Sequence, residues 1–205
     1  MNNRDIKGIV VDAGHGGSDP GAISNGIYEK DLNLKAANYM YKRLQELGIP
    51  SVITRDTDQT LSREERLDIM NNSFGNGRDV IILSNHINSD GGEGAEIVYS
   101  LRDDDTLATS VLNSIGEAGQ KIRRVYQRRL PEDPSRDYYY IMRETGNTQP
   151  LLIEYGFIDT PNDVARLNQN IEKYAEAVVK AVAEYIGVPY TPPDSSTSPN
   201  PSTYI

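Results

Sequence analysis

The sequence predicts a single α/β domain with a mostly parallel, twisted sheet of about six strands and helices on both faces. Its 205 residues suit one domain with one core. Short apolar runs of strand length alternate along the chain with longer segments whose apolar residues recur at helical spacing. This alternation is typical of sheets whose parallel strands are joined by helices that cover both faces.

The first half of the chain contains three expected strands and two expected helices. Residues 8–12 form an apolar run that ends in a glycine-rich turn, as a buried strand does. Apolar side chains between residues 32 and 47 share one helical face, and a glycine closes that helix. Residues 51–54 and 79–84 are expected strands, and Ser62 begins a second helix between them.

The second half is expected to add strands and helices of the same kinds. Residues 93–100 alternate between polar and apolar side chains, which predicts a fourth strand. Asp104 or Asp105 can cap a helix that runs to about Ile115. The remaining expected elements are an extended segment at 138–142, a short buried strand at 151–153, and two helices at 162–167 and 172–186.

Composition excludes several classes of function. The chain carries 21 Lys and Arg against 30 Asp and Glu, a formal charge of −9, which argues against nucleic acid as a partner. Its apolar runs fall well short of the ~20 residues that a membrane-spanning helix needs, so we expect no membrane partner either. The absence of cysteine excludes disulfides, cysteine-ligated metals and thiol nucleophiles.

The two histidines, His15 and His86, each follow an expected strand. The carboxyl ends of parallel strands form the usual ligand-binding edge of such a sheet, so both imidazoles are expected there. Two histidines with one carboxylate can hold a catalytic zinc ion. The acidic side chains expected near this edge are Asp12, Asp19, Glu29 and Glu154.

Two of these carboxylates have competing interpretations. Glu29 opens the first helix, and the glycine-rich loop before it can fold back to bring it against His15; stabilisation of the helix dipole explains it equally well. Glu154 follows the strand at 151–153, where it can act as a general base toward a metal-bound water. A hydrogen bond into the neighbouring turn is the alternative for Glu154.

Other glycine and arginine patterns carry weaker signals. The loop after residue 13 lacks the third glycine of a dinucleotide fingerprint, and the chain lacks a phosphate-binding Gly-Lys-Ser/Thr and a Gly-x-Ser-x-Gly nucleophile motif. One basic cluster stands out and consists of Arg123, Arg124, Arg128 and Arg129. It has two interpretations, a solvated face or a surface that attracts an anionic polymer.

The motif Val10–Ala22 resembles the opening motif of the zinc-dependent N-acetylmuramoyl-L-alanine amidases, the type 3 amidases of cell-wall turnover. The resemblance covers roughly residues 7–187. Further matches follow in the order of that family: Glu29 with Asn33, 61–66, 84–88, 94–99, 150–154, 156–158 and Asp163. The resemblance implies Zn²⁺ as cofactor, with His15, Glu29 and His86 as its ligands and Glu154 as the catalytic residue.

The same resemblance implies a peptidoglycan hydrolase. Such an enzyme cleaves the amide bond between N-acetylmuramic acid and L-alanine by zinc-activated water, with Glu154 as general base. We expect a monomer with an open cleft, because the helical insertion of some regulated members is not apparent. Asn85, Ile87 and the turn at 159–161 depart from the family pattern, which affects loop contacts rather than the metal site.

Two other hypotheses remain open at this stage. A zinc peptidase or deacylase would have a similar site and a different substrate. A non-catalytic wall-binding module is the other, and the complete set of ligands together with Glu154 argues against it.

Residues 189–205 are rich in Pro, Ser and Thr, so we expect a catalytic domain at 1–188 and a linker or tail that leads to a missing cell-wall-binding module. The first residues lack the pattern of a signal peptide. A wall substrate without a signal suggests an endolysin released by lysis or a holin, or an autolysin whose signal was removed.

Overall fold

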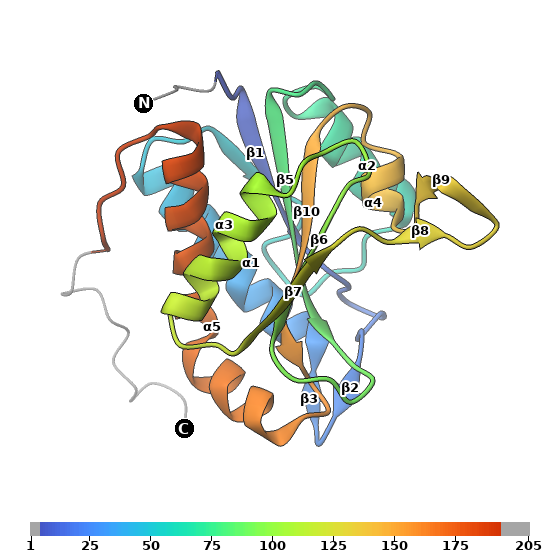
Figure 1. Ribbon diagram of the computed structural model, residues 1–205, viewed down its shortest axis with the longest axis vertical. Coiled ribbons are helices and arrows are strands. Elements are labelled where there is room, and N and C mark those ends of the chain that lie inside the picture. Colours follow the sequence, from blue (N-terminus) through green and yellow to red (C-terminus); the bar gives the residue numbers. More distant parts are fainter. Residues whose placement is uncertain (1–4, 194–205) are drawn as a thin grey trace.

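The computed structural model describes residues 5–193, in which a six-stranded sheet forms the centre of the fold (Figure 1). Strands β4, β1, β5 and β10 run parallel, β6 is antiparallel to β10, and β7 is parallel to β6. The α/β class and the mostly parallel sheet are therefore confirmed. In spatial order the strands are β4 (Ser51–Ile53), β1 (Gly8–Ala13), β5 (Val80–Asn88), β10 (Gln149–Phe157), β6 (Ala95–Tyr99) and β7 (Ile122–Tyr126).

Helices cover both faces of the sheet, but unequally. The long helices α1 (Glu29–Glu46), α3 (Thr106–Glu117) and α5 (Pro161–Ile186) pack together on one face. The other face carries α2 (Arg63–Asn72) and the single turn α4 (Tyr140–Arg143) over a smaller apolar cluster. Two short hairpins complete the fold: β2 (Ile23–Ser24) with β3 (Ile27–Tyr28), and β8 (Arg129–Leu130) with β9 (Asp133–Asp137), which projects from the body (Figure 1).

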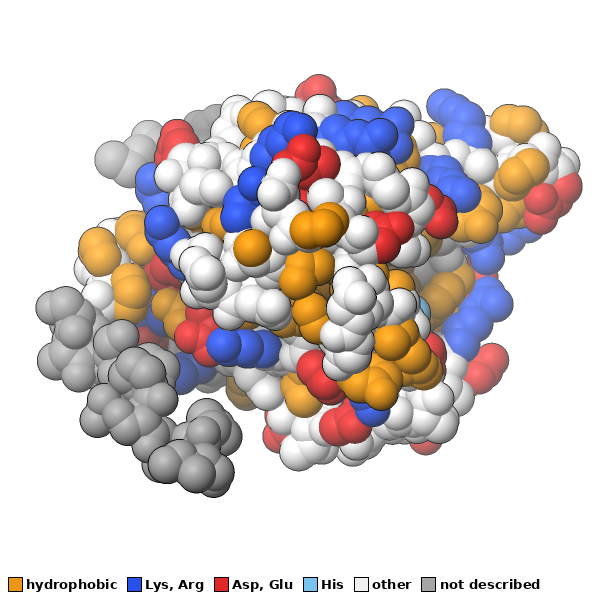
Figure 2. Space-filling model, turned by 90° about the horizontal axis from the view of Figure 1, so that it is seen from below, with side chains coloured by type: hydrophobic (Ala, Val, Ile, Leu, Met, Phe, Trp, Pro, Cys, Tyr) orange, Lys and Arg blue, Asp and Glu red, His pale blue; other side chains and the backbone are white. Residues whose placement is uncertain are grey.

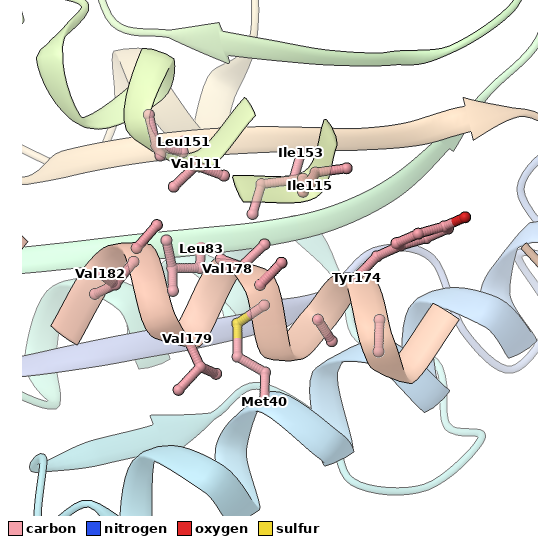
Figure 3. Close-up of a cluster of buried hydrophobic side chains, with 14 of the residues drawn as sticks. Met40, Leu83, Val111, Ile115, Leu151, Ile153, Tyr174, Val178, Val179 and Val182 are labelled. Carbon is pink, nitrogen blue, oxygen red and sulfur yellow. The ribbon is translucent and has the colours of Figure 1, made fainter. Parts of the chain in front are cut away.

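The larger core lies between the sheet and the three long helices. Figure 3 shows α5 crossing the strands, with Val178 and Val182 directed toward Leu83 and with Met40 of α1 beneath them. All four side chains are completely buried. Burial of such side chains is the main favourable term in folding, so α5 ties α1 and α3 to the sheet.

The capping signal at Ser62 is confirmed at the start of α2. The Ser62 hydroxyl accepts from the Glu65 backbone N–H, and the Glu65 carboxylate accepts from the Ser62 N–H. This reciprocal pair satisfies two donors that the first turn of a helix leaves unpaired. It fixes where α2 begins, and α2 carries Arg66 to the functional edge of the sheet.

Several element boundaries differ from the sequence-based expectations. β5 runs on to Asn88 and β10 to Phe157, so His86 and Glu154 lie within strands rather than beyond their ends. Both strands continue because they still pair with each other there, Glu154 beside His86. The apolar pattern in the sequence ends before the strands do because the side chains of His86 and Glu154 line a polar cavity.

Three further differences have local causes. The expected extended segment at 138–142 is wrong from Tyr140 onward, because α4 forms there and buries Ile141 and Met142. The two expected C-terminal helices are one helix, α5, since Ile171 between them is buried on the same face. β7 and both hairpins were not expected, because their sequences are short and mostly polar.

The first residues of the expected tail lie against the domain. The Tyr190 hydroxyl donates to Glu176 over 2.8 Å, and Arg43 donates to the Thr191 carbonyl oxygen over 2.8 Å. The domain therefore continues past residue 188, and the rest of the expected linker, 194–205, lies outside the described residues. Across residues 5–193, the helices are too short or too polar to cross a membrane.

We predict that Met40→Ala lowers the free energy of unfolding by about 2–5 kcal/mol, because it leaves a cavity between α1 and α5. Denaturant unfolding of the purified protein measures this. Lys42→Ala on the same helix is the control: its side chain is 70% exposed, and a change within about 0.5 kcal/mol is expected. Equal effects of the two substitutions would contradict the described packing of α1.

Candidate metal and catalytic site

A cavity of about 500 Å³ opens at the carboxyl edge of the parallel strands. The end of β1, the loop after it and the start of α1 form one wall, and β5 and β10 form the floor. Leu61, Arg63 and the α4 segment close the other side. The cavity therefore gathers side chains from parts of the chain that are far apart in sequence, including both histidines.

Three of the expected site residues meet in this cavity. His15, Glu29 and His86 each offer one ligand atom, and these atoms lie within 4.8 Å of one another. The Glu29 carboxylate stands between the two rings, 3.2 Å from His15 Nε2 and 2.9 Å from His86 Nδ1. Two imidazoles and one carboxylate form a donor set that suits zinc.

Backbone groups hold the Glu29 carboxylate in place. Glu29 is the first residue of α1 and is only 4% exposed. One carboxylate oxygen accepts from the Ile87 N–H and the other from the Ala22 N–H. Burial by itself would raise the pKa of Glu29, but the hydrogen bonds and charges of His15 and His86 outweigh it and lower that pKa. Glu29 therefore stays ionised, which is the form of a carboxylate that can bind a metal ion.

His15 is oriented by a second carboxylate. Its Nδ1 lies 2.8 Å from Asp19, which leaves Nε2 directed toward Glu29. Burial lowers the pKa of His15, but Glu29 and then Asp19 raise it to about 9. The backbone at His15 has φ of 60°, a region that non-glycine residues rarely adopt. Asp19 is thus an orienting partner of the kind that metal-binding histidines usually have.

Two glycines leave room for the cluster. A Cβ atom at Gly14 would lie 2.3 Å from His86 Cε1. At Gly21, where φ is +65°, a Cβ atom would lie 2.5 Å from a Glu29 carboxylate oxygen. Any other residue at either position would push a ligand side chain out of place, so the cluster depends on the glycine-rich loop.

Asp12 is not part of the cluster of His15, Glu29 and His86, but its hydrogen bonds stabilise the backbone next to it. Its carboxylate accepts hydrogen bonds from Thr54, Ser84 and Arg66 and is 1% exposed. Burial would raise the pKa of Asp12, but the Arg66 charge and the two hydroxyls lower it. The pair between Arg66 and Asp12 therefore anchors α2 to the end of β1.

Arg55 was missed by the sequence analysis. This residue is 1% exposed and donates to backbone carbonyl oxygens of Ala13, Gly14, His15 and Lys30. Its guanidinium therefore fixes the loop that carries His15 and joins it to the start of α1. A lone arginine after an expected strand has no distinguishing sequence signal.

Asn85, one of the departures from the family pattern, has a structural role. Its side-chain amide donates to the Asp12 carbonyl oxygen, and its Oδ1 accepts from the Tyr155 hydroxyl. These bonds join β1, β5 and β10 on the face away from the cavity.

Glu154 lies in the cavity beside the cluster. It pairs with His86 on the adjacent strand and is 8% exposed. Among the described residues, its Oε2 has no hydrogen-bond partner. Burial is the largest cause that raises the pKa of Glu154, to about 7, against the lowering effect of His86. A carboxylate that is poised near neutrality and unpaired in a cavity suits proton transfer.

The chain is similar to known proteins over most of its length. The family model described as N-acetylmuramoyl-L-alanine amidase matches residues 9–186. The sporulation-specific N-acetylmuramoyl-L-alanine amidase of Bacillus subtilis (strain 168) is 35% identical over 162 residues, which are 78% of this chain and 59% of the relative. The chain therefore spans about three fifths of that relative's length.

The solved structures that are similar to this fold include those of two bacterial proteins. The catalytic domain of CwlV, an N-acetylmuramoyl-L-alanine amidase from Bacillus (Paenibacillus) polymyxa var. colistinus, has a TM-score of 0.76 and 26% identity; the match covers 90% of this chain and all of that one. Cwp6 from Clostridium difficile has a TM-score of 0.78 and 32% identity, over 87% of this chain and 29% of that one.

We predict that Asp12→Asn lowers the free energy of unfolding by about 3–5 kcal/mol, because it leaves the buried Arg66 without a counter-charge. Denaturant titration near neutral pH measures the change. Asp79→Asn is the matched control, since Asp79 pairs with Lys7 at the surface, where water screens the pair, and a much smaller loss of stability is expected. A loss for Asp12→Asn no larger than that of the control would show that the pair does not anchor α2.

Proposed function

The chain belongs to the N-acetylmuramoyl-L-alanine amidase family, and on this premise we propose that it hydrolyses the amide bond between N-acetylmuramic acid and L-alanine in the peptidoglycan of bacterial cell walls. The observation that carries the proposal is the convergence of His15, Glu29 and His86 beside the unpaired carboxylate of Glu154 in one cavity. Cleavage of an amide requires a polarised carbonyl, an activated water and a proton for the leaving nitrogen, and this set of residues can provide all three.

We propose that His15, Glu29 and His86 hold a zinc ion. The fit rests on the donor set, on the loop glycines that make room for it, and on the Asp19 contact that orients His15. Bound zinc supplies Lewis-acid chemistry: it polarises a carbonyl and lowers the pKa of water toward about 7.

Glu154 supplies the proton transfers. Its unpaired oxygen is available to accept a proton from the attacking water. The same carboxyl group then donates that proton to the nitrogen of the departing peptide, so that the amine leaves as a neutral group. Because burial keeps the pKa of Glu154 near 7, both the acceptance and the return of the proton are accessible at neutral pH.

We predict that the parent protein binds one zinc ion per chain and that His86→Ala abolishes stoichiometric binding, because two ligands hold zinc far more weakly than three. Metal analysis after dialysis measures the content. Asn88→Ala is the matched control, since Asn88 lies on the same strand and lines the same cavity without belonging to the cluster. Unchanged zinc content and affinity in His86→Ala would refute this assignment of ligands.

We predict that Glu154→Gln reduces hydrolysis of peptidoglycan by at least about 10²–10⁴-fold while zinc content and melting temperature stay near those of the parent. Glutamine keeps the shape of the side chain but cannot accept the proton. Release of muropeptides and the appearance of new alanine amino termini measure both the rate and the bond that is cut.

Glu172→Gln, an identical change at a partly exposed position of α5 that does not line the cavity, controls for loss of charge and should retain full activity. Activity of Glu154→Gln within a few-fold of the parent would contradict the general-base role. New amino termini other than alanine would instead favour a zinc peptidase of similar geometry.

A further inference from the structure

A row of charged side chains crosses the sheet at the level of the proposed catalytic residue. Strand pairing places His86 beside Glu154, Glu154 beside Glu96, and Glu96 beside Arg124, on β5, β10, β6 and β7 respectively. Side chains of directly paired residues face the same side of a sheet. The row therefore continues from the proposed metal site, past Glu154, to a basic edge of the molecule.

Glu96 holds two arginines at this edge. It is 1% exposed, and one of its carboxylate oxygens accepts from Arg123 over 2.7 Å and from Arg124 over 2.9 Å. Each guanidinium also lies over an aromatic ring, Arg123 over Phe157 and Arg124 over Tyr126. The buried Glu96 carboxylate thus holds both guanidinium groups in place, although the two arginine side chains are about half exposed. The three residues together carry one net positive charge at a fixed position.

The basic edge is continuous with the cavity through an aromatic wall. Tyr139 lines the cavity, and its hydroxyl accepts from Arg128, whose guanidinium stacks on Tyr138 at 3.8 Å. The Arg128 guanidinium also lies 5.7 Å from the centroid of the Tyr139 ring, and the Arg124 guanidinium lies 4.2 Å from that of Tyr126 on the same strand. A ligand that leaves the cavity on this side meets Tyr139 and then Arg128 and Arg124.

The charge of this segment is opposite to that of the whole chain. Residues 121–143 contain seven Lys and Arg against three Asp and Glu, whereas the chain carries −9. Figure 2 shows Lys and Arg side chains along the side of the molecule that carries the β8–β9 hairpin. A fixed positive edge on an acidic protein attracts anions specifically to that edge.

We propose that Arg124 and Arg128, positioned by Glu96 and Tyr139, form a subsite for the free α-carboxylate on the second residue of the leaving peptide. This inference rests on the proposed function. Glu154 must reach the leaving nitrogen, so the departing peptide begins beside Glu154, and Arg124 lies two strands further on, on β7. Neighbouring strands are ~4.8 Å apart and an extended chain covers ~3.4 Å per residue, so two residues of the peptide cover most of the distance to β7 and the long Arg124 side chain, which reaches back to Glu96, covers the rest.

The test compares two soluble ligands that differ by one charge. They are N-acetylmuramoyl-L-alanyl-D-glutamate and its α-amide, N-acetylmuramoyl-L-alanyl-D-isoglutamine. Calorimetric binding to zinc-supplemented Glu154→Gln protein avoids turnover. We expect the free carboxylate to bind roughly 10-fold more tightly, the low end for a hydrogen bond between charged groups because the guanidinium is half exposed, and we expect added salt to reduce the preference.

Arginine substitutions in the same background locate the subsite. Arg124→Gln should remove most of the preference for the carboxylate, and Arg124→Lys should keep part of it. Arg129→Gln is the matched control, since Arg129 lies on the hairpin and donates to the Pro134 carbonyl oxygen. Melting temperatures identify any arginine variant that has lost its fold. The preference for the carboxylate ligand is first measured in the Glu154→Gln protein with all its arginines in place, so the test does not rely on the arginine variants alone.

Equal affinity for the two ligands, or binding of neither, overturns the subsite. A preference that persists in Arg124→Gln and Arg128→Gln overturns its location. A preference for long anionic wall polymers alone would show that the edge binds polymer instead of the peptide. Hydrolysis of peptidoglycan by the parent protein is measured separately, so that failure of the proposed amidase activity is distinguishable from failure of the subsite.

Discussion

The carboxylate of Glu29 is the interaction on which the rest of the site depends, because it brings two imidazoles from distant parts of the chain to one point. A buried carboxylate between two rings is costly unless its oxygens are satisfied. The N–H groups of Ile87 and Ala22, which belong to different segments, donate hydrogen bonds to these two oxygens. The position of Glu29 at the start of α1 therefore determines how the glycine-rich loop and β5 must meet.

Buried charges around this centre fall into two kinds. Asp12, Glu29 and Glu96 are each compensated by cationic partners and hydrogen-bond donors, so they organise the backbone around them. Glu154 differs because one of its oxygens has no partner among the described residues. A buried carboxylate oxygen without a partner is unfavourable for stability, and the proposed role of Glu154 in proton transfer would account for this arrangement.

The fold class could be predicted from the sequence because strand ends and the order of motifs are local signals. The same signals placed the four expected site residues, His15, Glu29, His86 and Glu154, at one edge of the sheet. The sequence could not predict that β5 and β10 run on past His86 and Glu154, since the continuation depends on pairing between segments about 70 residues apart. The contacts of Arg55 with the loop that carries His15, and of Glu96 with two arginines, could not be predicted for the same reason: they join residues 25 to 42 positions apart. The short helix α4 forms because Ile141 and Met142 complete an apolar cluster that only the folded sheet creates.

The two sides of Glu154 differ in the side chains that they hold, and this asymmetry gives the cavity a direction. On one side Glu29 is matched by His15 and His86, and on the other Glu96 is outnumbered by the two arginines that it holds. A peptide that carries carboxylates is repelled by the acidic surface of the chain and attracted to the basic edge. In the proposed reaction the scissile amide would then lie across Glu154 in one orientation, with the leaving nitrogen toward the arginines. Electrostatic attraction at the basic edge would thus orient the amide before any proton moves, which is how positioning lowers the barrier of a hydrolytic reaction.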